Sequence, residues 1–196
     1  MRRRAVLCAV AALGILPALA ADYKNDAGVV VGYIAPSSDS TILGVKTEAD
    51  STVDYGVEYK RRFLESNRLS IGGTLLFSSF DVKAGGVKAG DIDNVAFLVD
   101  GNWHFLANKA LYAGVTAGYS SWGDFNPEGG GGNISVKSDF IYGINAGYDI
   151  PIGAHFLILT NLRYLGMKAE TDVAGADNQT IDVNPIVANV GFAYRW

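Results

Sequence analysis

The residues of this chain with the clearest capacity for chemistry are charged and polar side chains at every second position. Glu58 and Lys60 are two residues apart, as are Asn102 and His104. This spacing places side chains on one face of a β-strand, where acids and bases can pair, move a proton or bind a ligand. Five such residues are expected near the same end of their strands, namely Glu58, Lys60, His104, Asp149 and Arg195. Because buried charges need partners, we expect a polar plug of ion pairs, with a proton or ligand site as the alternative.

The sequence lacks a convincing catalytic, cofactor or metal motif. Gly129 to Gly132 have neither the Lys nor the Ser or Thr of a phosphate-binding loop. His104 and His155 lack the paired spacing of a metal site. Asp91 and Asp93 could contact a divalent cation, but we interpret them as residues of a solvated loop. We therefore predict that the protein is not an enzyme and needs no metal and no cofactor.

The N-terminus has the features of a secretory signal peptide. Arg2 to Arg4 precede an apolar stretch from Ala5 to Leu16, and Ala18-Leu19-Ala20 fits a cleavage site. The apolar stretch has about 12 residues, whereas a transmembrane helix needs roughly 20. We expect residues 1–20 to be removed, and with them Cys8, the only cysteine. Residues 21–196 would then form one domain without a disulfide.

The charge balance disfavours nucleic acid as a partner. The chain has 16 Lys and Arg residues against 20 Asp and Glu residues. Loss of the three N-terminal arginines leaves 13 basic residues, so the net charge falls to about −7. Nucleic-acid phosphates would be repelled by this sign of charge.

Eight stretches alternate large apolar side chains with glycine or small polar ones. They run roughly over Gly28 to Pro36, Thr52 to Arg61, Arg68 to Phe80, Asn94 to Phe105, Ala110 to Trp122, Asp139 to Ile150, His155 to Leu165 and Asp182 to Trp196. Alternate side chains lie on opposite faces of a strand, and glycine suits a crowded interior. The apolar faces must then contact lipid. This predicts an all-β fold, an eight-stranded antiparallel transmembrane barrel in a bacterial outer membrane. A soluble sandwich is the alternative, but it would expose a surface of glycines.

The connections between these stretches alternate in length. The long polar ones are Ser37 to Ser51, Asp81 to Asp93, Gly123 to Ser138 and Gly166 to Ile181. Short turns follow the second, fourth and sixth stretches. Long loops outside and short periplasmic turns are typical of outer-membrane barrels, whose termini both lie in the periplasm.

An eight-stranded barrel is too narrow for a wide aqueous pore. Towards the loops, however, the inward positions become apolar. A candidate passage for small hydrophobic solutes consists of Leu76, Phe80, Leu98, Ile141, Leu159 and Leu165. Plain core packing is the alternative explanation for these residues.

Two further features lie in the first and last strands. Pro36 and Pro185 are expected at comparable heights where these strands meet, and proline has no N–H to donate. They therefore predict a lateral gap near the loops, unless both prolines merely end their strands. Phe192, Tyr194 and Trp196 resemble the C-terminal signal that is read by the barrel assembly machinery.

The order GYDIPIG, LRYLGMKAET and IDVNPIVANVGFAYRW resembles the outer membrane protein W family, and the resemblance extends over the mature chain. It implies a narrow barrel that passes small hydrophobic molecules through the outer membrane. Some members are also surface receptors for bacteriocins. Asn184 and Ile186 depart from the acidic and aromatic residues that usually flank the proline, and Leu159 replaces a common polar residue. The expected partners are outer-membrane lipids and lipopolysaccharide, the assembly machinery and small hydrophobic solutes; a structural or adhesive barrel is the alternative function.

Overall fold

The computed structural model describes residues 24–37, 40–42, 45–63, 68–105, 110–128, 134–152, 154–171 and 179–196. The predicted signal peptide, residues 1–20, lies outside these ranges. Within them, no helix has the length and apolar character needed to cross a membrane.

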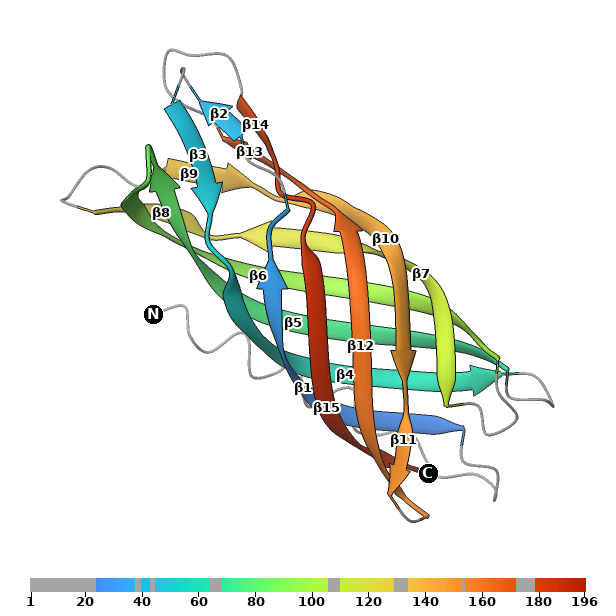
Figure 1. Cartoon of the computed structure of the whole chain (residues 1–196). Coiled ribbons are helices and arrows are strands. Elements are labelled where there is room, and N and C mark those ends of the chain that lie inside the picture. Colours follow the sequence, from blue (N-terminus) through green and yellow to red (C-terminus); the bar gives the residue numbers. More distant parts are fainter. Residues whose placement is uncertain are drawn as a thin grey trace.

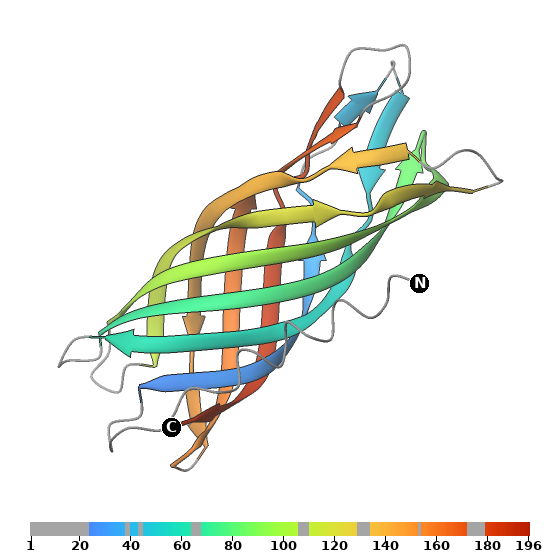
Figure 2. The same ribbon diagram turned by 180° about the vertical axis from the view of Figure 1, so that it is seen from behind.

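Eight long antiparallel strands form a closed barrel (Figures 1 and 2). They are β1 (Asn25–Ala35), β4 (Thr52–Phe63), β5 (Leu69–Ala84), β6 (Val87–His104), β7 (Leu111–Trp122), β10 (Asp139–Tyr148), β12 (Phe156–Gly166) and β15 (Ile186–Arg195). Each pairs with the next one in this order, and β15 pairs with β1. The predicted fold class is thus confirmed.

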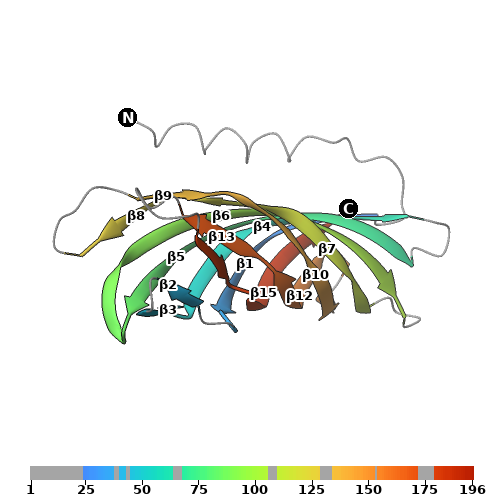
Figure 3. The same ribbon diagram turned by 90° about the horizontal axis from the view of Figure 1, so that it is seen from above.

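Short strands extend the wall beyond the loop end, which Figure 3 shows from above. They are β2 (Ser40–Ile42), β3 (Val45–Ala49), β8 (Asp124–Pro127), β9 (Ile134–Lys137), β13 (Lys168–Thr171) and β14 (Gln179–Asp182). At the opposite end, β11 (Ile150–Ile152) pairs with β12. The predicted loop from Asp81 to Asp93 was wrong, because β5 and β6 continue as a hairpin through it. Its turn is made by Gly85 and Gly86, whose φ angles of 60° and 83° favour glycine.

One row of paired residues runs around the whole barrel and measures the tilt of its strands. It passes from β7 through every wall strand and returns to β7 ten residues beyond its start. Eight strands with a shear of ten are tilted by about 35–45°, and side chains nearly fill the interior. The row consists of Tyr112, Gly147, Asn161, Asn189, Gly32, Asp54, Ser78, Asn94 and Trp122.

The two faces of the wall differ as the alternation predicts. Outward side chains such as Tyr55 and Val115 are each 64% exposed, whereas inward Leu98 is fully buried. The glycines inside meet crowded surroundings. A Cβ at Gly147 would lie 2.3 Å from the hydroxyl oxygen of Tyr112 and 2.2 Å from the carbonyl oxygen of Thr160. Glycine at this position therefore lets the Tyr112 ring lie directly against the neighbouring strand.

Candidate functional site

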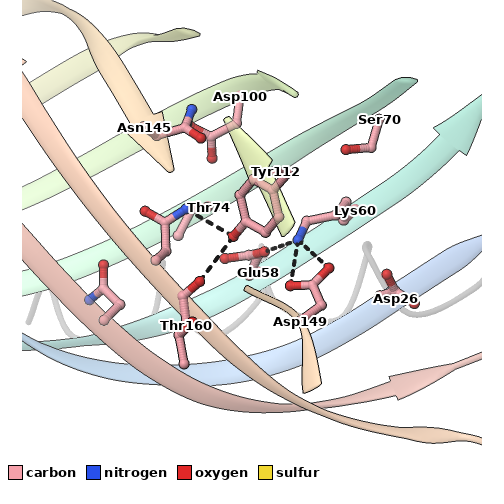
Figure 4. Close-up of polar contacts among 12 residues, drawn as sticks. Asp26, Glu58, Lys60, Ser70, Thr74, Asp100, Tyr112, Asn145, Asp149 and Thr160 are labelled. Carbon is pink, nitrogen blue, oxygen red and sulfur yellow. Dashed lines mark hydrogen bonds and ion pairs between the residues drawn. The ribbon is translucent and has the colours of Figure 1, made fainter. Parts of the chain in front are cut away.

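A chain of ion pairs lies at the end of the lumen near the short turns, and Figure 4 shows its part around Lys60, Glu58 and Asp149. Lys60 Nζ lies 3.1 Å from Asp149 Oδ2, and Arg62 Nη2 lies 3.0 Å from the same oxygen. Arg62 Nη1 also contacts Asp26 at 2.5 Å, and Asp26 binds Arg195 Nε at 2.8 Å. The Lys60, Arg62, Asp26 and Asp149 side chains are at most 3% exposed. The alternating signs give each buried charge at least one partner.

A second polar cluster surrounds Arg163, further towards the loops. The Arg163 guanidinium lies 2.8 Å from Asp100 and donates to Thr74 Oγ1 at 3.1 Å and Asn189 Oδ1 at 3.0 Å. Asn189 in turn donates to both oxygens of Asp54, at 2.8 and 3.0 Å. Five strands thus share one hydrogen-bonded network.

Glu58 lies between the two clusters and links them. Its carboxylate oxygens are 3.5 Å from Lys60 and 3.8 Å from Arg163. Tyr112 closes the space beside it. The Lys60 ammonium lies 4.3 Å from the centre of the Tyr112 ring, a cation–π contact, and Asn161 donates to the Tyr112 hydroxyl at 3.0 Å. We refer to both clusters, with Glu58 and Tyr112, as the polar half of the lumen.

Four of the five predicted plug residues, Glu58, Lys60, Asp149 and Arg195, are linked through ion pairs. Lys60 contacts both Glu58 and Asp149, and Arg195 is joined to them through Asp26 and Arg62. Asp26 and Arg62 were missed by the sequence prediction, which began the first strand at Gly28 and ended the second at Arg61. Their parity with the lumenal positions was the signal that would have found them.

His104 bonds a hydroxyl. Its Nε2 lies 3.0 Å from Ser70 Oγ, and the centre of its ring lies 5.3 Å from the centre of the Tyr112 ring. A serine beside a histidine is the geometry of a nucleophile with its base. Both side chains are 0% exposed, however, so a substrate has no access to them. In the part of the chain that the structure describes, no group of three metal-binding side chains comes together.

On the loop side of these clusters the lumen is lined by apolar side chains. The six residues of the predicted passage are all at most 3% exposed and belong to one cluster: Leu76, Phe80, Leu98, Ile141, Leu159 and Leu165. Leu159 lies deeper than the rest, one alternation below Asn161 on β12. Trp122 packs against this cluster, and its ring centre is 5.7 Å from that of Phe80. We refer to the cluster beyond Arg163 as the apolar half of the lumen.

The two predicted prolines face each other across the seam, the line along which β1 meets β15. The regular pairing ends at Ala35 and Ile186, immediately before Pro36 and Pro185. Beyond the prolines, the Ser37 N–H donates to the carbonyl of Val183 at 3.3 Å, and its hydroxyl donates to the carbonyl of Asn184. Ser37 therefore closes the seam above the prolines.

The two strands that meet at the seam differ in how their loop ends are bonded to the neighbouring strands. The end of β15 stays attached to β12, because Leu165 N–H donates to Pro185 and Val183 N–H donates to Met167. The end of β1 has left β4, since that pairing stops at Ile34. Asn184 has a φ of 35°, in the left-handed region that is unfavourable for a residue with a side chain.

The predicted assembly signal lies at the other end of the seam. The carbonyl of Trp196 accepts the N–H groups of Lys24 and Asn25 at 3.1 Å, so the last residue is bonded to the first strand. The Trp196 ring stacks on Tyr194, and Phe192 stacks on Phe156. These rings lie on the outer wall.

Salt bridges at the loop end are exposed, unlike those in the lumen. Lys83 lies 2.7 Å from Asp50, and Lys88 lies 2.7 Å from Asp81. The hydrogen bond to Asp50 raises the pKa of Lys83.

Comparisons with known proteins agree with this architecture. The family model described as outer membrane protein beta-barrel domain matches residues 6–195. The structure is similar to that of the outer membrane protein OprG from Pseudomonas aeruginosa, with a TM-score of 0.73 and 18% identity over 89% of this chain and 96% of OprG. It is also similar to the outer membrane protein AlkL, with a TM-score of 0.62 and 15% identity over 93% of this chain and 95% of AlkL. None of the curated proteins matches the chain significantly.

Proposed function

Because the chain belongs to the outer membrane protein β-barrel family, and is thus a protein of the bacterial outer membrane, we propose that it provides a narrow apolar passage for small hydrophobic molecules. The division of the lumen carries this proposal. The half towards the loops presents apolar side chains such as Leu98 and Ile141. A hydrophobic solute can lie against these side chains without breaking a hydrogen bond. A water-filled channel would instead need a polar lining there.

The route we propose does not continue to the periplasm through the lumen. The ion pairs around Lys60 and Arg163 fill the polar half, and an apolar solute could pass only by separating buried charges. The seam offers a shorter exit. Regular pairing of β1 with β15 ends at Pro36 and Pro185, and Pro36 has no N–H to bond β4, so fewer hydrogen bonds hold the end of β1 than the rest of the strand.

We infer that the end of β1, Ala35 to Ser37, is the part that moves. It is attached to β15 above the prolines through Ser37 alone among the described contacts, whereas β15 remains bonded to β12. Displacement of this segment would let a solute leave sideways into the membrane near the headgroups, where water can satisfy the freed carbonyl groups.

Uptake into vesicles tests the passage and its exit separately. Purified barrel in vesicles with lipopolysaccharide in the outer leaflet should speed the uptake of small apolar compounds relative to protein-free vesicles. Pro36→Val adds an N–H on the side of β1 that faces β4, so it should hold the end of β1 in place and slow that uptake. Pro151→Val, in β11 at the opposite end of the barrel, is the matched control. Equal uptake with and without wild-type protein would refute the passage; equal uptake by Pro36→Val and wild type would refute only the lateral exit.

A structural or adhesive barrel that acts through its loops is the second candidate. It is favoured by the tight packing of the apolar half, where Leu98 and Ile141 are fully buried, so that the passage is closed in this structure. Transport then requires side chains to move aside for the solute. Uptake that stays at the protein-free level, together with normal barrel stability, would support this second function.

We also propose that Phe192, Tyr194 and Trp196 are read by the barrel assembly machinery. Deletion of Trp196 should reduce the folded, heat-modifiable form in outer-membrane fractions far more than deletion of an exposed loop residue such as Glu128. Unchanged heat-modifiable mobility and amount of the Trp196 deletion would contradict this proposal.

A further inference from the structure

The apolar half of the lumen contains one enclosed hydrogen-bond donor that is not used. Trp122 is the last residue of β7, and its ring is partly buried against Phe80 and the apolar cluster. Its Nε1–H is shielded from solvent and finds no acceptor among the described residues. Buried polar groups are rarely left without a partner, so such a donor calls for an explanation.

The neighbouring polar groups do not accept this hydrogen bond. Asn94 is paired with Trp122 in the β6–β7 ladder, but its Nδ2 points to Ser120 Oγ, at 2.5 Å, and to the carbonyl of Ser121, at 3.5 Å. Neither of these contacts uses the indole N–H of Trp122, which stays without a partner.

The other buried atoms without a hydrogen-bond partner are of a different kind. Three are amide oxygens of Asn102, Asn145 and Asn161, all in the polar half. The remaining two belong to Asp26 and Arg62, which form an ion pair with each other. Among the buried side-chain atoms of the described residues, the apolar half thus has one donor without a partner and no acceptor without a partner.

We propose that Trp122 Nε1–H binds the carbonyl oxygen of a solute whose remaining surface is apolar, such as a medium-chain ketone or ester. A carbonyl accepts a hydrogen bond and brings no donor, so both partners are satisfied in the apolar half. A hydroxyl would bring a donor for which no buried side-chain acceptor is left without a partner there, and an alkane would leave the indole unpaired. This proposal rests on the passage proposed above and names the solute class that it would favour.

Uptake of two matched probes tests the specificity. 2-Nonanone and nonane have the same chain length and differ in one carbonyl oxygen. Trp122→Phe keeps an aromatic ring and removes the donor, so the ratio of ketone to alkane uptake should fall about two- to tenfold. Trp103→Phe, which changes a lipid-facing ring that is 44% exposed, should leave the ratio unchanged.

The outcomes separate this inference from the passage itself. If wild-type protein speeds the uptake of neither probe, the passage fails; if it speeds both and Trp122→Phe keeps their ratio, the role of Trp122 fails. Nuclear magnetic resonance gives a readout that is independent of transport. The indole N–H resonance that disappears in Trp122→Phe should shift when 2-nonanone is added and stay fixed with nonane. If the position of this resonance does not change when 2-nonanone is added, the proposal is wrong.

Discussion

The two halves of the lumen are built by the same eight strands but are held together by different forces. In the polar half, ion pairs and hydrogen bonds join side chains such as Arg163 and Asp100 at defined distances and angles. In the apolar half, Leu98 and its neighbours make contacts that have no preferred direction. A directional network resists displacement, whereas apolar side chains can exchange rotamers without losing a bond. The comparison indicates that the half towards the loops is the one that can open.

The largest expected effect is the loss of a shared anion in the polar half. Asp149→Leu removes the nearer carboxylate of Lys60 and one of the two carboxylates that contact Arg62, so two buried cations each lose a partner. Breaking a buried pair typically costs about 3–5 kcal/mol of unfolding free energy. Urea unfolding in lipid vesicles measures it.

A second substitution controls for the change in shape. Adding Lys60→Met to Asp149→Leu removes the stranded ammonium, so part of the lost stability should return. A single mutant as stable as the wild type would mean that the polar half is not held by its charges, and the comparison would fail.

A cavity in the apolar half should destabilise the barrel and also widen the passage. Leu98→Ala removes a fully buried side chain, and such changes cost about 2–5 kcal/mol. Unlike Asp149→Leu, it should increase the uptake of apolar solutes into vesicles, because no polar group blocks the enlarged space. Lower stability without faster uptake would favour the structural function.

Removal of the Ser37 hydroxyl tests whether this side chain holds the seam between β1 and β15 closed. Ser37→Ala loses the hydrogen bond to the carbonyl of Asn184, worth about 0.5–1.5 kcal/mol. We expect a small loss of stability together with faster uptake of apolar solutes. Ser79→Ala on β5 is the control, since its side chain is exposed and far from the seam in the ladder. Equal uptake by both variants would show that Ser37 does not hold the exit closed.

The smallest effect is expected at the exposed salt bridge beyond the wall. Lys83→Met removes the partner of Asp50, and both side chains are 37% exposed. Exposed pairs contribute little because water and salt screen them. The unfolding free energy of Lys83→Met should match that of the wild type. A decrease as large as that of Asp149→Leu would show that buried and exposed salt bridges contribute equally to stability.

The sequence was sufficient to predict the wall and its two faces. Alternation is a local property, so residues such as Val115 and Thr116 reveal their faces without knowledge of their neighbours in space. The ends of the strands were harder to predict. Asp26 and Arg62 lie beyond the apolar stretches, but the ladder continues there because Arg62 N–H still finds a carbonyl, that of Lys24.

The arrangement inside the lumen could be predicted only in part. Contacts across the barrel depend on the shear, which brings Tyr112 and Trp122 of one strand to the two ends of the same row. A shear of ten cannot be read from the alternation of any single strand. For this reason the sequence indicated that Asp100 and Arg163 face inward, but not that they are partners. The short strands beyond the wall were also missed, since β8 and β9 contact no lipid and need no alternating pattern.

The seam between β1 and β15 has a consequence for the order of folding. Pairing of β1 with β15 joins residues as far apart in the chain as Asp26 and Arg195, which are 169 positions apart, so closure of this seam has the largest loop-closure cost among the strand pairings. The ion pair of Asp26 with Arg195 forms only when the last strand arrives. Until then, a partly assembled sheet presents unpaired edges and incompletely neutralised lumenal charges, which membrane lipid does not tolerate. Insertion must therefore await the C-terminus, and folding strand by strand from the N-terminus is disfavoured by the same contacts that make the finished barrel stable.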